Sequence, residues 1–174
     1  MASYTIRPAT LRDAKTIANI HASVQDTIYS QLVPVGYAKG SEPAESGLVF
    51  WREAIEYGEP QVQVAVDDDG KIIGFVGFDR SRDKGTKPTV GEIWALHVLP
   101  THWNTGAGLA LWDAAREGLA DEGCTQVTVW LPLGNERALR FHELAGFKRE
   151  LNSARTVPVG SFRLEEIRLK RATG

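Results

Sequence analysis

The segment 98–112 has the composition of an anion-binding turn. An expected strand ends at Pro100, the loop that follows contains Gly106 and Gly108, and an amphipathic helix begins near Leu109. Backbone N–H groups of a glycine-containing loop can converge on an anion, and a helix N-terminus adds about half a positive charge. The sequence therefore predicts a phosphate or pyrophosphate site here. The alternative interpretation is that the two glycines permit tight packing of strand against helix.

Two common phosphate-binding motifs do not fit this loop. No Gly-Lys-Ser or Gly-Lys-Thr follows it, so it is not a P-loop. The Gly-x-x-Gly spacing and the downstream acid of a dinucleotide fingerprint are also missing. A dinucleotide-dependent oxidoreductase is therefore a poor interpretation of this sequence.

A second motif follows in residues 135–147, which read Asn-Glu-Arg-Ala-Leu-Arg-Phe-His-Glu-Leu-Ala-Gly-Phe. Together with the loop at 103–108, it resembles the GNAT superfamily of N-acetyltransferases. That family has a Gln/Arg-x-x-Gly-x-Gly/Ala loop, followed later by Asn-x-x-Ala, an aromatic pair and Gly-Phe. Trp103 stands at the Gln/Arg position, and His142 stands where the family usually has Tyr. The resemblance covers almost the whole chain.

This resemblance implies one domain over residues 1–174 with an α/β fold, in which about four helices flank a mixed, mostly antiparallel sheet of about six to seven strands. It implies an acyl-CoA-dependent N-acetyltransferase. Such an enzyme moves an acetyl group from acetyl-CoA to a primary amine of a small molecule by direct transfer in a ternary complex, and no metal is expected. Two alternatives stay open: an acyl-CoA-binding sensor without catalytic activity, and an N-acetyltransferase that acts on a protein or peptide amine.

Hydrophobic periodicity predicts interleaved strands and helices. Strands are expected near residues 4–7, 61–66, 71–78, 90–99 and 125–131, from 147, and at 162–169. Helices are expected from 11 into the late twenties, at 47–57, from 109 to about 123, and from 135 to 145. Residues 31–47 contain several prolines and glycines, and we expect a loop there that acts as a lid.

The resemblance also assigns residues to acetyl-CoA. Backbone N–H groups of the loop would bind the pyrophosphate, and a main-chain N–H near Leu96 would polarise the thioester carbonyl. Asn135 would bind the pantetheine amides or cap its helix. Arg137, Arg140 and Lys148 are candidates for the 3′-phosphate, with a solvated basic face as the alternative. The expected cofactor-binding residues are Leu96, His97, Val98, Asn104, Thr105, Gly106, Ala107, Gly108, Leu109, Asn135 and Arg140.

Two side chains are candidates for proton transfer. We expect His142 to protonate the departing thiolate near neutral pH, and a packed, hydrogen-bonded ring is the alternative. Glu92 is the candidate base, and strand alternation places it on one face with Trp94 and Leu96. His97 is the second candidate base and is expected on the opposite face. A solvated carboxylate is the alternative for Glu92.

The acceptor site is expected between the first two helices and the last hairpin. Aromatic side chains with a few carboxylates suit a small amine with an apolar body, and core packing is the alternative for each aromatic. The candidates are His21, Asp26, Tyr29, Tyr37, Trp51, Phe78 and Trp94.

Composition excludes several other classes of protein. The 174 residues carry a net charge of −2, which gives no overall basic field for nucleic acid. Cys124 is the single cysteine, so an intrachain disulfide and a multi-cysteine metal site are excluded. No apolar run reaches the roughly 18 residues of a membrane span. We therefore expect a cytoplasmic protein without nucleic-acid or membrane partners, and we consider a homodimer.

Overall fold

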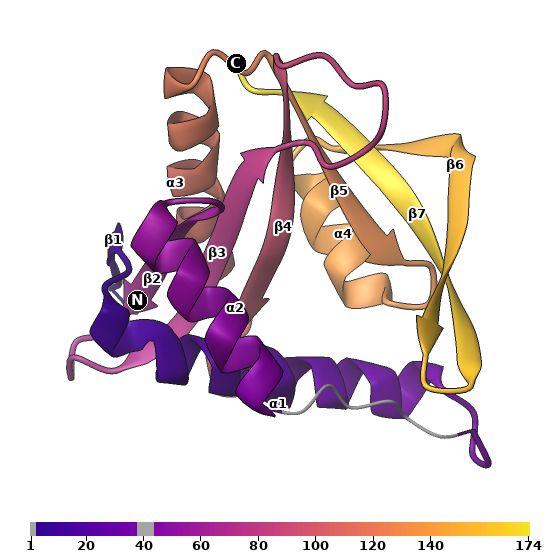
Figure 1. Cartoon of the computed structure of the whole chain (residues 1–174), viewed down its shortest axis with the longest axis horizontal. Helices are drawn as coiled ribbons and strands as arrows, with labels where there is room; N and C mark the ends of the chain where they lie inside the picture. The colour runs from indigo at the N-terminus through magenta and orange to yellow at the C-terminus, as the bar shows by residue number, and fades with distance from the viewer. Residues whose placement is uncertain (1–2, 38–43) are drawn as a thin grey trace.

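One seven-stranded sheet organises the chain in this computed structural model, which describes residues 3–37 and 44–174 (Figure 1). Its order is β1-β2-β3-β4-β5-β7-β6. β4 and β5 run parallel, and each other neighbouring pair is antiparallel. This confirms the expected mixed, mostly antiparallel sheet. The strands are β1 (Thr5–Pro8), β2 (Gln61–Val66), β3 (Ile72–Arg80), β4 (Val90–Val98), β5 (Gln126–Pro132), β6 (Lys148–Val159) and β7 (Phe162–Ala172).

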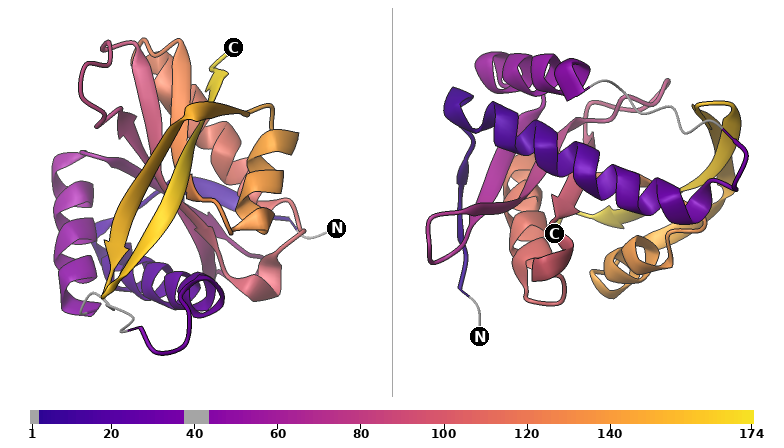
Figure 2. Two further views of the ribbon diagram at one scale, coloured as in Figure 1. Left: turned by 90° about the vertical axis from the view of Figure 1, so that its right-hand side faces the viewer. Right: turned by 90° about the horizontal axis from the view of Figure 1, so that it is seen from below.

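Four α-helices and two short 3₁₀ turns complete the described part of the chain. They are η1 (Leu11–Asp13), α1 (Ala14–Leu32), α2 (Ala44–Tyr57), η2 (Pro100–His102), α3 (Ala107–Asp121) and α4 (Glu136–Leu144). α1 and α2 cover one face of the sheet, and α3 and α4 cover the other (Figure 2). The expected helices are confirmed. Residues 38–43 of the expected lid lie outside the described residues.

Of three hydrophobic clusters among the described residues, the two larger ones pack helices onto the central strands. On one face, Leu111 of α3 packs in a cluster with Ile93 of β4. On the other, Ile17 of α1 and Trp51 of α2 pack in a cluster with Phe75 of β3. Burial of each such side chain contributes about 1.5–3 kcal/mol to the free energy of folding. Since the two clusters lie on opposite faces, β3 and β4 are held in place from both sides.

β4 contains one extra residue at Trp94. Gly77 of β3 lies opposite Ala95, and Phe78 lies opposite Ile93, so Trp94 is the residue that β3 does not match. An inserted residue of this kind is a β-bulge, and it reverses the side-chain alternation beyond it. The side chains after the bulge therefore point to the faces opposite to those predicted from a regular strand.

β4 and β5 separate just beyond the bulge. Their parallel pairing covers Val90–Ile93 and Gln126–Val129 and ends there. Figure 1 shows the two strands diverging toward their C-terminal ends. The second half of β4 is thereby left with an open edge next to the loop that joins it to α3.

Candidate active site

The open edge of β4 presents backbone hydrogen-bonding groups to the gap. The Leu99 N–H donates to the carbonyl of Ile73 on β3 at 2.8 Å. Since successive residues of a strand point their backbone groups to opposite sides, Leu96 and Val98 direct theirs away from β3. These are two of the residues expected to contact acetyl-CoA, and the expected contact of the Leu96 N–H with the thioester oxygen stays a prediction.

The loop after β4 ends in the N-terminus of α3. Asn104 has a φ of 60° and Gly106 a φ of 92°, so both adopt the left-handed conformation just before the helix. The first intrahelical bond runs from the Ala110 N–H to the Gly106 carbonyl. The N–H groups of Ala107, Gly108 and Leu109 belong to the first turn, where no helical partner exists. These three N–H groups, here called the cradle, lie at the positive end of the helix dipole and are the site that the sequence predicts for a phosphate.

Gly108 has a packing role as well. A Cβ at this position would lie 3.1 Å from the ring of Phe141 on α4. The close approach of α3 to α4 therefore depends on this glycine, whereas a Cβ at Gly106 would meet no atom within 4 Å. The packing interpretation therefore holds for Gly108, and the phosphate-binding interpretation stays a prediction.

Side-chain contacts fix the rest of the loop. The Thr105 hydroxyl donates to the His102 carbonyl at 2.5 Å and accepts from the Tyr4 hydroxyl at 2.7 Å. Trp103 donates its indole N–H to the Val98 carbonyl at 2.8 Å. The Arg137 guanidinium lies 3.7 Å above the same indole. The tryptophan at the family's Gln/Arg position thus fastens the loop to the end of β4 and to α4.

Asn135 caps α4. Its side-chain oxygen accepts from the Ala138 N–H at 3.3 Å, as an N-cap residue does. The expected capping role is confirmed. Arg140 lies exposed on the same helix, and its expected contact with the 3′-phosphate stays a prediction.

His142 is enclosed between α4 and β6. Only 4% of the residue is exposed, and its ring meets those of Phe141 and Phe147 edge-on. Nδ1 lies 2.8 Å from the Ala138 carbonyl, which can only accept, so Nδ1 carries the proton. Nε2 is buried without a partner among the described residues. Burial lowers the pKa of His142 to about 4. The expectation that this imidazole titrates near neutral pH is therefore wrong, because the uncharged ring is favoured.

Glu92 is buried and held by the loop between β3 and β4. Its residue is 1% exposed, which overturns the solvated alternative. One carboxylate oxygen accepts from the Arg82 backbone N–H at 2.9 Å, and the other accepts from the Arg82 guanidinium at 2.5 Å. That guanidinium also lies 4.1 Å above the ring of Trp94. Glu92 and Arg82 thus fix the loop against the bulge.

The bulge corrects the expected distribution of side chains on β4. Trp94 contacts Phe50 of α2, and the His97 ring lies 5.7 Å from Phe75 in the core that α1 and α2 cover. Leu96 instead packs against the core beneath α3. His97 therefore shares the face of Trp94, and Leu96 does not, because the inserted residue reverses the alternation.

Several residues expected at the acceptor site belong to the core. Phe78 is fully buried beneath α3, and Trp51 of α2 is 1% exposed and faces the core, so neither lines an acceptor site. The Trp51 indole N–H donates to Nδ1 of His21 at 3.2 Å. His21 in turn stacks on His97 with 5.0 Å between ring centroids. Burial lowers the pKa of both histidines, and that of His97 falls to about 3.

A charged network on the same face of the sheet was not predicted. Trp130 of β5 donates its indole N–H to both oxygens of Asp83 at 3.1 Å. Arg155 of β6 lies 3.8 Å above the Trp130 ring, and Arg168 of β7 lies 5.7 Å from it. Arg168 also donates to Asp83 at 3.0 Å. The alternation of Thr128, Trp130 and Pro132 with apolar residues was the sequence signal that could have located it.

Comparison with known proteins identifies the family. Residues 26–147 match the acetyltransferase (GNAT) family. The chain belongs to this family. It is 32% identical over 129 residues to the uncharacterized N-acetyltransferase YuaI of Bacillus subtilis, a match that covers 73% of this chain and 70% of that protein. It is 30% identical over 101 residues to a mycothiol acetyltransferase of Kocuria rhizophila, but that match covers 56% of this chain and 33% of the relative.

Solved structures of GNAT proteins share the whole fold. The N-acetyltransferase from Staphylococcus aureus Mu50 superposes with a TM-score of 0.75 at 15% identity and covers 99% of each chain. The phosphinothricin acetyltransferase from Sinorhizobium meliloti, solved with acetyl-CoA, has a TM-score of 0.74 at 20% identity and covers 98% of this chain and 89% of its own. The GNAT chain is an acetyl-CoA-dependent N-acetyltransferase. In its described residues, no helix combines the length and apolarity needed to span a membrane.

Proposed function

We propose that this GNAT enzyme transfers the acetyl group directly to a primary amine of a small molecule in a ternary complex. The observation that carries the proposal is the open edge of β4 beside the N-terminus of α3. These backbone groups suit an extended chain with a diphosphate at one end. The second substrate is placed on the α1/α2 side of the same strand, beside Trp94, which is only half-buried. Direct attack needs no nucleophile from the enzyme, and Cys124 is buried away from this edge.

Backbone groups supply the binding and the electrostatic stabilisation. The N–H groups from Gly106 to Leu109 hold the phosphates, and the Leu96 N–H donates to the thioester oxygen as negative charge develops there. Acetyl-CoA itself supplies the activated acyl group and a thiolate leaving group. Glu92 is assigned here to positioning the bulge through Arg82, and the role of base that the sequence predicts for it is the alternative.

His142 fits the acid role only as a relay for a proton. The neutral ring has no proton on Nε2 to give, so Nε2 first takes one from the attacking nitrogen and then passes it to the departing sulfur. The N–H bond of the attacking nitrogen breaks as an Nε2–H bond forms, and that bond breaks as the S–H bond forms. His142→Phe is expected to lower kcat by about tenfold or more with little change in the KM for acetyl-CoA. An unchanged kcat would remove His142 from the mechanism.

Ligand-dependent thermal unfolding and thiol release test the proposal together. Acetyl-CoA and CoA should raise the Tm, and at about 100 times Kd the stabilisation is about 2.7 kcal/mol; ATP and NAD should have no effect. Free thiol should then appear with a small primary amine. Binding of acetyl-CoA without turnover of any small amine or peptide would favour the acyl-CoA sensor. Turnover with a peptide N-terminus alone would favour a protein acceptor.

A further inference from the structure

The network around Trp130 leaves one carboxylate oxygen unsatisfied. Glu150 of β6 accepts from Arg168 with a single oxygen, Oε2, at 2.6 Å from Nη2 and 3.2 Å from Nε. Its other oxygen, Oε1, is buried and has no hydrogen-bond partner within residues 3–37 and 44–174. A buried acceptor without a donor is costly, so such an atom commonly marks the place of a ligand or an ordered water.

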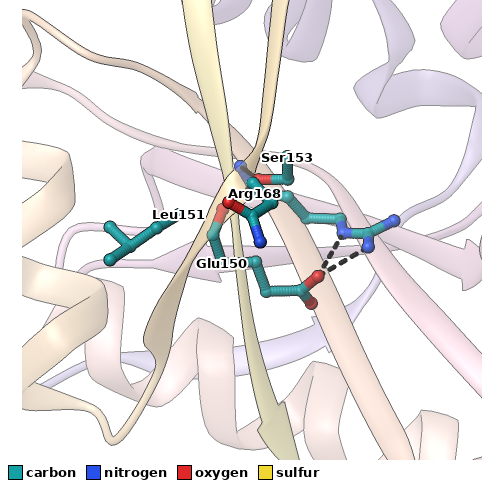
Figure 3. Close-up of a pocket in the computed structure, with 5 residues that line it drawn as sticks. Glu150, Leu151, Ser153 and Arg168 are labelled. Atoms are coloured by element: carbon teal, nitrogen blue, oxygen red, sulfur yellow. Dashed lines mark hydrogen bonds and ion pairs between the residues drawn. The ribbon is translucent and has the colours of Figure 1, made fainter.

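Glu150 borders a cavity of about 290 Å³, formed where β6 departs from β7. The register changes between Glu150, opposite Arg168, and Arg155, opposite Glu166. The four intervening residues bow outward, and Asn152 and Ser153 line the resulting pocket with Glu150 and Arg168. Figure 3 shows the Glu150 carboxylate with Arg168 bound at one oxygen only.

Glu150 and Arg168 line the pocket, and they belong to a larger ion-pair network whose charges do not balance. Asp83, Glu150 and Glu166 carry three negative charges, and their ion-pair partners Arg155 and Arg168 carry two positive charges. One negative charge is therefore uncompensated in the network. The unpartnered oxygen of Glu150 is the atom at which a donor is missing, so a positively charged nitrogen is the group that completes it.

The pocket lies in line with the bulge of β4. Trp130 pairs with Arg168, and Arg168 pairs with Glu150. Trp94 follows Ile93, which pairs with Val129, the residue before Trp130. A row of side chains on the α1/α2 face thus runs from Trp94 across β5 and β7 to Glu150. Three strand spacings of about 4.8 Å make this row roughly 15 Å long, and the separation of β4 from β5 lengthens it.

We propose that the pocket at Glu150 binds a second cationic nitrogen of the acceptor, so that the substrate is an elongated amine with two positively charged nitrogens. This rests on the proposed function, because the reacting nitrogen is placed at the bulge of β4. The distal ammonium pairs with the Glu150 carboxylate, which borders the pocket, and the row from Trp94 to Glu150 sets the distance between the two nitrogens.

The pocket is tested by comparing turnover of spermine with turnover of butylamine, an amine with a single charge. Both are assayed with the whole 174-residue chain. Glu150→Gln removes the charge and keeps the shape, and it should lower kcat/KM for spermine by about tenfold or more while leaving butylamine unchanged. Asn152→Phe should have the same effect by filling the cavity without touching the ion pairs. Glu165→Gln is the matched control, since Glu165 is exposed on β7 and does not line the pocket.

Calorimetric titration with spermine in the absence of acetyl-CoA gives a second readout. The unchanged protein should bind spermine, and Glu150→Gln should weaken the binding about tenfold. Equal binding by both proteins would overturn the inference, as would equal turnover of spermine by both. If amines are acetylated without preference for two charges, the inference fails and the proposed function stands. If no thiol is released with any amine, the proposed function fails and the titration alone decides the inference.

Discussion

His142 makes the stability of the fold depend on pH. Its pKa is about 4 in the folded chain and about 6.5 when unperturbed. As the pH falls below 6.5, the unfolded chain therefore binds a proton here that the folded chain does not, and stability is lost until the pH reaches about 4. The lowered pKa values of His21 and His97 act in the same direction.

The pH dependence of unfolding checks this residue. Between pH 7.5 and pH 5.0, His142 should account for a loss of roughly 2 kcal/mol in the free energy of unfolding. His142→Phe should reduce the loss by about that amount, because phenylalanine fills the same aromatic site without titrating. The measurement is urea denaturation of both proteins at both pH values. The same loss in both proteins would contradict the assignment.

Glu92 is expected to behave as a positioning residue. Glu92→Gln keeps the bond from the Arg82 backbone and weakens the one from the guanidinium, which should cost about 1.5–3 kcal/mol of stability. The kcat should fall because the bulge at Trp94 loses support. The pH–rate profile should keep its acidic limb. If that limb disappears while the stability is unchanged, Glu92 is the base after all.

At the scale of single elements, the loop before α3 depends on one left-handed glycine. Gly106→Ala forces a side chain into a φ of 92° and should cost about 1–2 kcal/mol. It should also reduce the rise in Tm that CoA produces, because the N–H groups of the cradle move. Gly70→Ala is the matched control: its φ is 80°, its Cβ meets nothing within 4 Å, and it lies in the distant β2–β3 turn. Equal responses to CoA in both variants would argue against the cradle.

The elements were largely predictable, and the bulge was not. The alternation in β2 and β3 and the helical spacing in α1 and α3 each show which face is buried. These elements can therefore be predicted from hydrophobic periodicity. With one extra residue in β4, the residues on each side of it still alternate normally. The change of face is revealed only by the pairing register with β3. For this reason regular alternation predicts the wrong face for Leu96 and for His97. The backbone role predicted for Leu96 remains compatible with the open edge of β4.

At the scale of the molecule, Asp83 joins distant parts of the chain. It connects the β3–β4 loop to Trp130 of β5 and to Arg168 of β7. The alternation in β5 places Trp130 on the polar face, but it does not identify the partners, which are separated by up to 85 residues. The same holds for Arg82 and Glu92, whose pairing depends on how the loop folds back onto β4.

Removing the Asp83 charge should loosen the β6–β7 hairpin. Asp83→Asn weakens the bonds from Trp130 and Arg168, and the expected cost is about 1–3 kcal/mol. Hydrogen exchange should show faster opening of β6 and β7, with α3 unaffected. Asp113→Asn is the control, because Asp113 makes an exposed ion pair with Arg116 on α3 that should contribute less than about 1 kcal/mol. Uniform acceleration over the whole chain would mean that Asp83 stabilises the fold globally.

The two halves of β4 have different neighbours in the sheet. Up to Ile93 the strand is an internal member of the sheet, with neighbours on both edges. After Trp94 the strand keeps β3 on one edge, and its other edge is open. A single inserted residue therefore separates a half of the strand that is paired on both edges from a half that is paired on one edge only. Deleting Trp94 would leave Ile93 opposite Phe78 and Ala95 opposite Gly77 in regular pairing, so the later side chains would keep their faces and only the bulge would be lost.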